Sequence, residues 1–306
     1  MKIIVPHKLT LTQCSIAESD EDDGAVWEEG KSYAKGDKVR YEHAIYLSLA
    51  ASNKGNKPSE TWSGENAKWG KYGATGPYKM LDDYVETQTE APKGEKLTFT
   101  VPFNRATAFA LLNMEGASAH VTVTDTDDDE VLFDEEFSLI EDISHLSLFE
   151  YYFEPLVCVD VFTRTSLPFA INGTLMVELD PGDETLQAKI GHVVVGRDRY
   201  IGMTKYEAEV GTTDYSRKVV DEFGSTTLVR RSFAKTASLP IYLHPDQSNG
   251  VTRILQDIRA TPCVFLGDNM DEGYRALMIF GWLEDWRHVF SAPNEVELSM
   301  EIQGLI

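Results

Sequence analysis

The 306-residue sequence predicts a mainly β, multidomain protein. Apolar and polar residues alternate with period two in many short runs, which is typical of half-buried strands. Only residues 249–262 show the spacing of an amphipathic helix. Six aromatic residues gather between Trp27 and Trp69, with almost no aliphatic run among them. We therefore expect a small three-stranded aromatic module, a β-sandwich, and a C-terminal β-rich domain with one helix.

Composition and charge exclude several classes of protein. The formal net charge is −22, from 50 acidic and 28 basic residues, and such a chain repels nucleic-acid phosphates. The three cysteines are far apart and form no CxxC pair, so we expect free thiols in a protein made in a reducing cytoplasm. No apolar run approaches the length of about eighteen residues that a membrane helix needs, and the first residues lack the apolar core of a signal peptide.

Residues 1–23 are expected to form an N-terminal arm. Residues 1–17 alternate weakly, which predicts an edge strand or an extended arm, and residues 18–23 form an acidic hinge. Glycines and a proline interrupt the chain again at residues 73–77. The aromatic segment, residues 24–73, is therefore interpreted as a module between two linkers.

A segment of this size cannot bury much aliphatic core, so its rings have two possible roles. They can form a miniature core, for which Trp27, Tyr33, Tyr46 and Trp69 are the candidates. They can also lie flat on the surface, where a sugar face stacks on an exposed ring. The candidates for such a saccharide-binding platform are Tyr41, Trp62 and Tyr72, of which at least two should be exposed and coplanar.

Short strands fill residues 78–180, which predicts the sandwich. The alternating runs are residues 97–101, 120–124, 131–133 and 174–179, and Asn172-Gly173 is a typical hairpin-turn dipeptide. Residues 155–162 are a longer apolar strand, expected to be buried on both faces.

The C-terminal domain, residues 181–306, is also expected to be mostly strands. The predicted strands are residues 190–195, 226–230, 238–243, 263–266, 277–282 and 296–302. In the expected helix, Asn249-Gly250 opens the segment, Val251, Ile254, Leu255 and Ile258 share one face, and Pro262 ends it. Cations cluster at Arg217-Lys218, Arg230-Arg231 and Lys235; they either pair within the chain or contact acidic patches of a neighbouring subunit.

The sequence contains no recognisable catalytic, metal or cofactor site. No two of the seven histidines have a metal-ligand spacing, and HExxH, GxSxG and Walker-type motifs are absent. Residues 125–130 are acidic and could bind calcium, but they lack the mid-loop glycine, and a solvated turn between strands is the alternative. We expect no catalytic residue, no metal and no cofactor.

The aromatic segment resembles the small three-stranded carbohydrate-binding modules of families 5 and 12. The pattern consists of Trp27, Tyr33, Gly36-Asp37, Val39, Tyr41, Tyr46, a turn with Gly, Asn and Pro, and Trp69. In chitin-binding members an aromatic pair follows the strand that corresponds to residues 46–49. Here Ala50-Ala51-Ser52 follows instead, so chitin binding does not carry over.

The order of several phrases resembles one group of tailed-bacteriophage tail proteins. These phrases are Gly73-x4-Tyr78-Lys79-Met80-Leu81-Asp82, residues 108–114 and 119–123, Ile201-Gly202, residues 214–218, 221–224 and 231–235, and the closing strand 298–304. The resemblance implies a virion structural protein at the tail tip or baseplate, made in the host cytoplasm. Its partners would be copies of itself and other tail or baseplate proteins, without nucleic acid and without membrane insertion.

Three classes of function remain open. The first is a structural tail-tip subunit that forms oligomers and displays the module. The second is a receptor-binding adhesin that recognises a host-surface glycan. The third is a glycoside hydrolase with an attached binding module.

Overall fold

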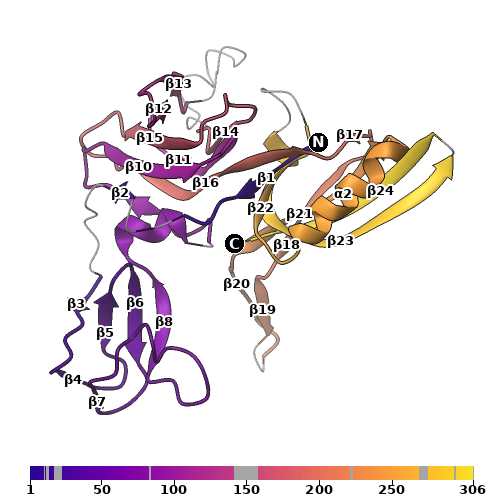
Figure 1. Cartoon of the computed structure of the whole chain (residues 1–306). Helices are drawn as coiled ribbons and strands as arrows, with labels where there is room; N and C mark the ends of the chain where they lie inside the picture. Colours follow the sequence, from indigo (N-terminus) through magenta and orange to yellow (C-terminus); the bar gives the residue numbers. More distant parts are fainter. Residues whose placement is uncertain are drawn as a thin grey trace, which may run out of the picture.

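The computed structural model describes residues 1–9, 11, 14–16, 23–82, 84–140, 158–220, 223–268, 275–292 and 294–305. The protein is mainly β, and Figure 1 shows a sandwich, a sheet covered by helix α2, and a small module below the sandwich. No helix in these ranges is long and apolar enough to cross a membrane.

A five-stranded antiparallel sheet forms one layer of the sandwich. Its strand order is β13-β12-β15-β10-β2, with bounds Val131–Ser138, Ser118–Asp125, Asn172–Asp180, Leu97–Asn104 and Ser15–Ile16. Inward residues alternate along its inner strands, as in Leu97, Phe99 and Val101. They share one core with Phe109, Leu111, Val193 and Val195 of the opposite layer.

The opposite layer belongs to a sheet of eleven strands that runs through the whole body. Its main order is β14-β11-β16-β1-β22-β23-β24-β21-β17, and β9 and β18 attach to β16 and β21. The bounds are Val161–Arg164, Ala108–Glu115, Lys189–Tyr200, Lys2–Pro6, Cys263–Leu266, Met278–Ala292, Glu295–Gly304, Phe233–Leu243, Met203–Thr204, Thr89–Glu90 and Glu209–Asp214. Helix α2, Pro245–Asp257, packs on one face of the C-terminal half through a second core that includes Val251, Leu255 and Met300. A short helix, η3 (Arg275–Leu277), precedes β23.

The N-terminal strand is an inner strand, not the expected edge strand or free arm. Strand β1 pairs antiparallel with β16 on one side and β22 on the other. Ile3 and Ile4 are fully buried on opposite faces, Ile3 in the core under α2 and Ile4 in a third cluster with Ala110 and Val264. Because β11, which precedes residue 180, pairs with β16, which follows residue 181, the boundary expected between residues 180 and 181 does not separate two sheets.

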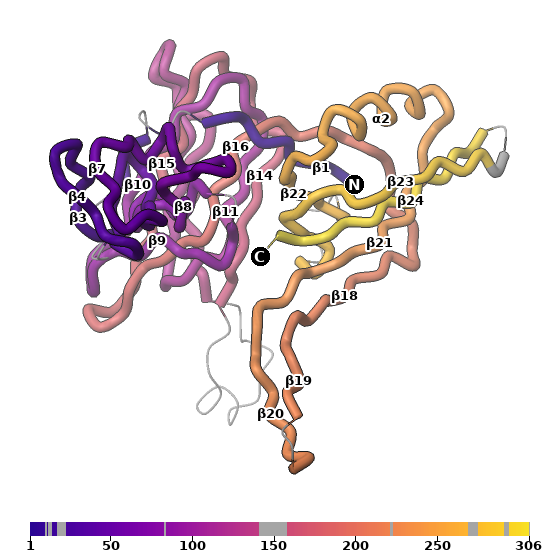
Figure 2. The backbone as a smooth tube through the Cα atoms, turned by 90° about the horizontal axis from the view of Figure 1, so that it is seen from below, coloured from indigo at the N-terminus to yellow at the C-terminus, as the bar shows by residue number. Residues whose placement is uncertain are grey.

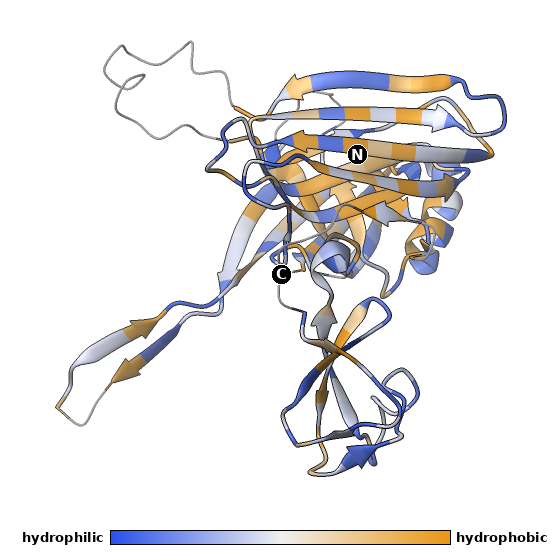
Figure 3. Cartoon of the chain, turned by 90° about the vertical axis from the view of Figure 1, so that its left-hand side faces the viewer, coloured by the Kyte–Doolittle hydropathy of each residue, from blue (hydrophilic) through white to orange (hydrophobic). Residues whose placement is uncertain are grey.

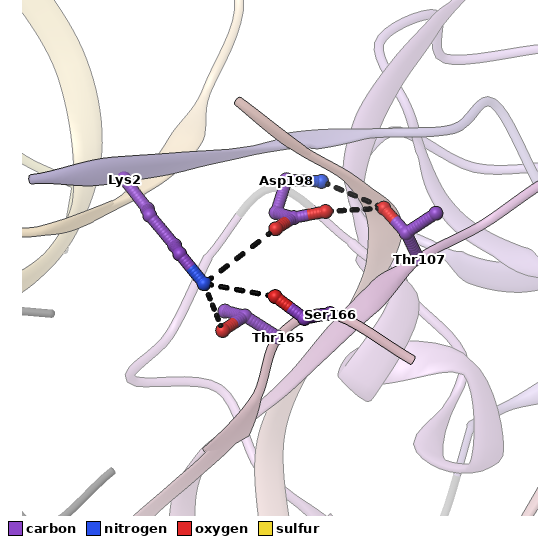
Figure 4. A network of polar contacts seen from close by, with 5 residues as sticks. All are labelled: Lys2, Thr107, Thr165, Ser166 and Asp198. Atoms are coloured by element: carbon purple, nitrogen blue, oxygen red, sulfur yellow. Dashed lines mark hydrogen bonds and ion pairs between the residues drawn. The ribbon is translucent and has the colours of Figure 1, made fainter. Parts of the chain in front are cut away.

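A polar cluster holds β1 to the sandwich side (Figure 4). The Nζ of Lys2 donates to Thr165 Oγ1 at 2.8 Å and to Ser166 Oγ at 3.0 Å, and lies 3.7 Å from Asp198 Oδ2. Asp198 in turn accepts a hydrogen bond from the Thr107 hydroxyl. The cluster therefore links β1, β16 and two loops of the sandwich.

Helix α2 starts earlier than the sequence predicts. It begins at Pro245, with His244 as its N-cap residue, so Asn249 and Gly250 lie inside it. Proline is favoured at the first helical position because it has no N–H to leave unpaired there. The helix ends at Asp257, before Pro262.

Asn172-Gly173 does not form the expected hairpin turn. Both residues open strand β15, where Asn172 faces Asn104 and Gly173 faces Phe103. A Cβ at Gly173 would lie 2.4 Å from the Phe103 ring, so glycine here makes room for that ring.

The expected strand at residues 155–162 falls partly outside the described residues. Of its described part, Cys158 is exposed and Phe162 is half-buried, so burial on both faces is not observed there. Strand β14 begins at Val161 and forms the edge of the large sheet.

The aromatic module has its own sheet, and separate segments lead the chain into it and out of it. Three antiparallel strands, β5 (Lys38–Tyr41), β6 (Ala44–Ser48) and β8 (Trp69–Ala74), are extended by a short parallel strand, β3 (Ala25–Val26). A two-residue pair, β4 (Ser32–Tyr33) with β7 (Asn53–Lys54), closes one side. Asp23, expected in a solvated hinge, is buried, and its carboxylate accepts the Gly76 N–H at 3.0 Å. Helix η2, Gly76–Leu81, then leads into the sandwich, where Met80 is fully buried.

Candidate functional site

Three of the four rings assigned to the module core are buried. Tyr33, Tyr46 and Trp69 cluster with Val39, and Trp27 packs against them while half-buried. The Tyr33 and Trp69 rings meet edge to face, with centroids 5.3 Å apart. The indole N–H of Trp69 donates to the Asn56 carbonyl at 2.8 Å, so the large turn before β8 is tied to this core.

Tyr41 lies on the core side of the module sheet. Its ring packs edge to face on Trp27 at a centroid distance of 5.5 Å. The ammonium group of Lys57 lies 5.5 Å from the Tyr41 ring centroid on the outer side. A lysine over a ring is a favourable cation–π contact, so the Tyr41 face is covered by a flexible cation.

Tyr72 lies on the other face of the same sheet. It occupies the bulge in β8, between Lys71 and Gly73, which pair with Tyr46 and Ile45. The Lys38 ammonium lies 5.4 Å from its ring centroid, and Lys38 points away from the core because its neighbour Val39 points in. Tyr72 is 66% exposed.

Trp62 lies in the turn between β7 and β8 and is 45% exposed. Among the described residues its ring contacts neither Tyr41 nor Tyr72, and these two tyrosines are on opposite faces. The three rings assigned to a sugar platform therefore do not form one coplanar surface. What the module offers is two separate exposed rings, Trp62 and Tyr72, each set among polar residues.

The described part of the chain contains no group of three or more residues placed to hold a metal ion. Asp125 ends strand β12 and is half-buried, whereas residues 126–130 connect β12 to β13 and their acidic side chains are exposed. None of the three cysteines forms a disulfide; burial raises the pKa of the Cys263 thiol to about 12, and of the three only Cys158 is exposed.

A cavity of about 370 Å³ lies between residues 6–9 and strand β16, and its lining includes His7, His192, Asp82 and Phe280. Among the described residues, the Nε2 of His7 and the Nδ1 of His192 find no hydrogen-bond partner. Burial lowers the pKa of His192 to about 4, so its imidazole is neutral in the folded protein at neutral pH. No local sequence pattern indicates this cavity, because the residues that line it come from distant segments.

A two-stranded ribbon leaves the C-terminal sheet and is exposed along its whole length. It consists of β19 (Arg217–Val220) and β20 (Thr226–Val229), which continue β18 and β21 (Figure 2). Exposed apolar side chains include Val220 at 55%, Leu228 at 75% and Phe223 at 92%. No sequence pattern predicts that these strands extend away from the body. The segment is nevertheless distinguished by its adjacent cations, which are unusual in an acidic chain.

The clustered cations form no close ion pair within the described part of the chain. Arg217, Lys218, Arg231 and Lys235 are absent from its ion pairs. Arg230 only adds a small electrostatic effect at Asp214, whose pKa is lowered mainly by hydrogen bonds from Ser216. Of the two expected arrangements, pairing inside the chain is therefore not seen here.

No protein-family model and no curated protein matches this chain. Among solved structures, it is similar to the chitosan-binding module 1 of a chitosanase/glucanase from Paenibacillus sp. IK-5. The two share 10% sequence identity with a TM-score of 0.25, over 39% of this chain and 82% of that one. A TM-score this low is too small to establish a shared fold.

Proposed function

We propose that this chain is a structural component of the tail tip or baseplate of a tailed bacteriophage. In this role it contacts copies of itself and other tail proteins, and it displays the aromatic module. The order of tail-protein-like phrases along the sequence supports this assignment. The observation that carries it is the separation of the module from the body: an eleven-stranded sheet runs through the body, whereas the module has a core of its own.

The body suits an assembly role for a physical reason. An isolated two-stranded hairpin is at best marginally stable in water, and the β19–β20 ribbon exposes valine, leucine and phenylalanine side chains. Contiguous exposed apolar surface of this kind marks interaction sites in stable proteins. A protein that functions as a monomer has no use for such an extension.

Sedimentation velocity of the full chain over a wide concentration range tests the assembly role. We expect the sedimentation coefficient to rise with concentration, alone or on adding neighbouring tail proteins. A chain that stays monomeric at every concentration, and binds no other tail protein, contradicts the proposal.

A second candidate function is recognition of a cell-surface saccharide, and the exposure of Trp62 and Tyr72 favours it. Exposed rings stack on sugar faces, and replacing one removes that contact without opening a core. We expect Trp62→Ala to lose binding on a glycan array while the melting temperature stays nearly unchanged. If binding and melting are both unchanged, Trp62 has no part in recognition; if the protein unfolds, the ring is structural.

A glycoside hydrolase is the competing class of function. Such an enzyme needs two carboxyl groups about 5–9 Å apart across the scissile bond. Our proposal predicts no sugar release from cell-wall or capsule preparations incubated with the full chain. Release of reducing sugar that is lost on removing a carboxylate pair would contradict it.

A further inference from the structure

The β19–β20 ribbon presents apolar and cationic side chains on both of its faces. Arg217 pairs with Val229 and Lys218 pairs with Leu228, so the two pairs point to opposite faces. Residues 215–231 hold four cations and two carboxylates in a chain whose net charge is −22. The ribbon is therefore a positively charged, apolar element on a strongly acidic protein.

The C-terminal sheet has one covered face and one open face. Leu239, Ile241, Leu298 and Met300 point toward α2 and are buried. The residues between them point the other way, because side chains alternate along strands.

Carboxylates form a row across the open face. Glu209 of β18 faces Ser238 of β21, Ser238 faces Glu301 of β24, and Glu301 faces Asp285 of β23. Glu209 and Glu301 are exposed and form no ion pair within 4 Å among the described residues; Arg287 is paired with Asp285 and also interacts electrostatically with Glu301.

A second row on the same face is apolar at its ends. Register places Met203, Tyr242, Glu297 and Val289 side by side. Met203 is 61% exposed and Val289 is 52% exposed, and Glu297 is paired with Lys205. The open face thus combines unpaired carboxylates with exposed apolar side chains, which complements the ribbon.

We propose that the ribbon of one copy of this chain docks on the open acidic face of the C-terminal sheet of a second copy. This inference rests on the assembly role proposed above and identifies the contact through which two copies assemble. The ribbon cannot reach its own acidic face, because β18 and β21 belong to the same sheet and extend directly into it. Figure 3 shows the ribbon pointing away from the body.

The contact is heterologous, since the ribbon and the open face are different surfaces. Each bound copy still offers a free ribbon or a free face, so repeated contacts produce a ring or a filament. Its charge complementarity makes the association sensitive to salt, because screening weakens attraction between exposed charges.

Two complementary charge reversals test the proposal by sedimentation velocity. The first variant carries Arg217→Glu and Lys218→Glu on the ribbon; the second carries Glu209→Lys and Glu301→Lys on the open face. Each alone brings like charges together, so we expect self-association to weaken by about tenfold or more. Mixed in equal amounts, the two variants again have opposite charges at the contact and should associate with each other. A Lys93→Glu and Arg259→Glu variant is the matched control, because both residues are exposed and lie away from the two surfaces.

The outcomes separate this contact from assembly in general. Weaker self-association of each variant, restored association on mixing, and little change in the control variant support the proposed contact. If the wild type associates but neither charge reversal changes the affinity, or if mixing does not restore association, the proposed contact is wrong, although the assembly role is not contradicted. If the wild type never associates, alone or with other tail proteins, the assembly role fails as well. Circular dichroism and thermal melting confirm that each variant is folded.

Discussion

The roles of two glycines, Gly173 and Gly250, depend on the residues that surround them in the fold. Gly173 belongs to a dipeptide that usually marks a turn, yet it lies in a strand opposite Phe103. Gly250 lies in helix α2, where an added Cβ would meet nothing within 4 Å. An added methyl group should therefore destabilise the protein at Gly173 but not at Gly250.

We expect Gly173→Ala to destabilise the protein by about 1–3 kcal/mol, since the new Cβ would overlap the Phe103 ring. Gly250→Ala should instead stabilise it by about 0.5–1 kcal/mol, because alanine is the better helix former. Urea unfolding followed by tryptophan fluorescence measures both. In a Phe103→Leu background, Gly173→Ala should cost less than in the wild type; an equal cost would mean that the ring is not the cause.

His192 should make the stability depend on pH. Burial lowers the pKa of this imidazole from 6.5 to about 4, so between these values the unfolded state binds a proton that the folded state does not. Stability is therefore highest above pH 6.5 and falls as the pH falls toward 4. From about pH 7 to pH 5 the contribution of His192 should drop by about 2 kcal/mol.

His192→Gln tests this sign and size. Glutamine does not titrate, so the difference in unfolding free energy between wild type and variant should shrink or reverse as the pH falls from 7 to 5. His244→Gln is the control, because His244 is exposed at the start of α2. A difference that stays constant with pH would show that His192 is not the group responsible.

At the scale of elements, the sequence predicts most strands but not their partners. Alternation is local, so it correctly predicts strands at residues 97–101, 120–124, 174–179 and 263–266. Pairing depends on residues far apart, and the position of β1 between β16 and β22 has no local signal. The same holds for the module, where the burial of Trp69 could be anticipated but the placement of Tyr41 and Tyr72 on opposite faces could not. The predicted helix start is too late because the apolar period begins only at Val251, whereas Pro245 is the first helical residue.

Strand β1 should couple the stability of the two halves of the body. Ile4→Ala removes fully buried side-chain volume, which costs about 2–5 kcal/mol. We expect amide hydrogen exchange to accelerate in both β16 and β22, its two neighbours. Leu175→Ala, in β15 of the sandwich, is the control and should act mainly on the sandwich strands. Faster exchange in only one neighbour of β1 after Ile4→Ala would show that the halves are independent.

At the scale of the whole molecule, the chain combines a self-contained aromatic module with a sheet-built body that extends a charged ribbon. The module and the body have separate cores, joined through Asp23 and helix η2. The ribbon and the open acidic face lie on the same body, so each copy can contact two others. These features give a consistent basis for a repeated subunit.

The most direct test of this account is a cryo-electron microscopy reconstruction of the tail end of the virion. It should contain several copies of this chain, with each β19–β20 ribbon lying on the C-terminal sheet of the next copy and each module facing outward. A virion without the chain, or copies whose ribbons project into solvent while their modules are buried, would contradict it.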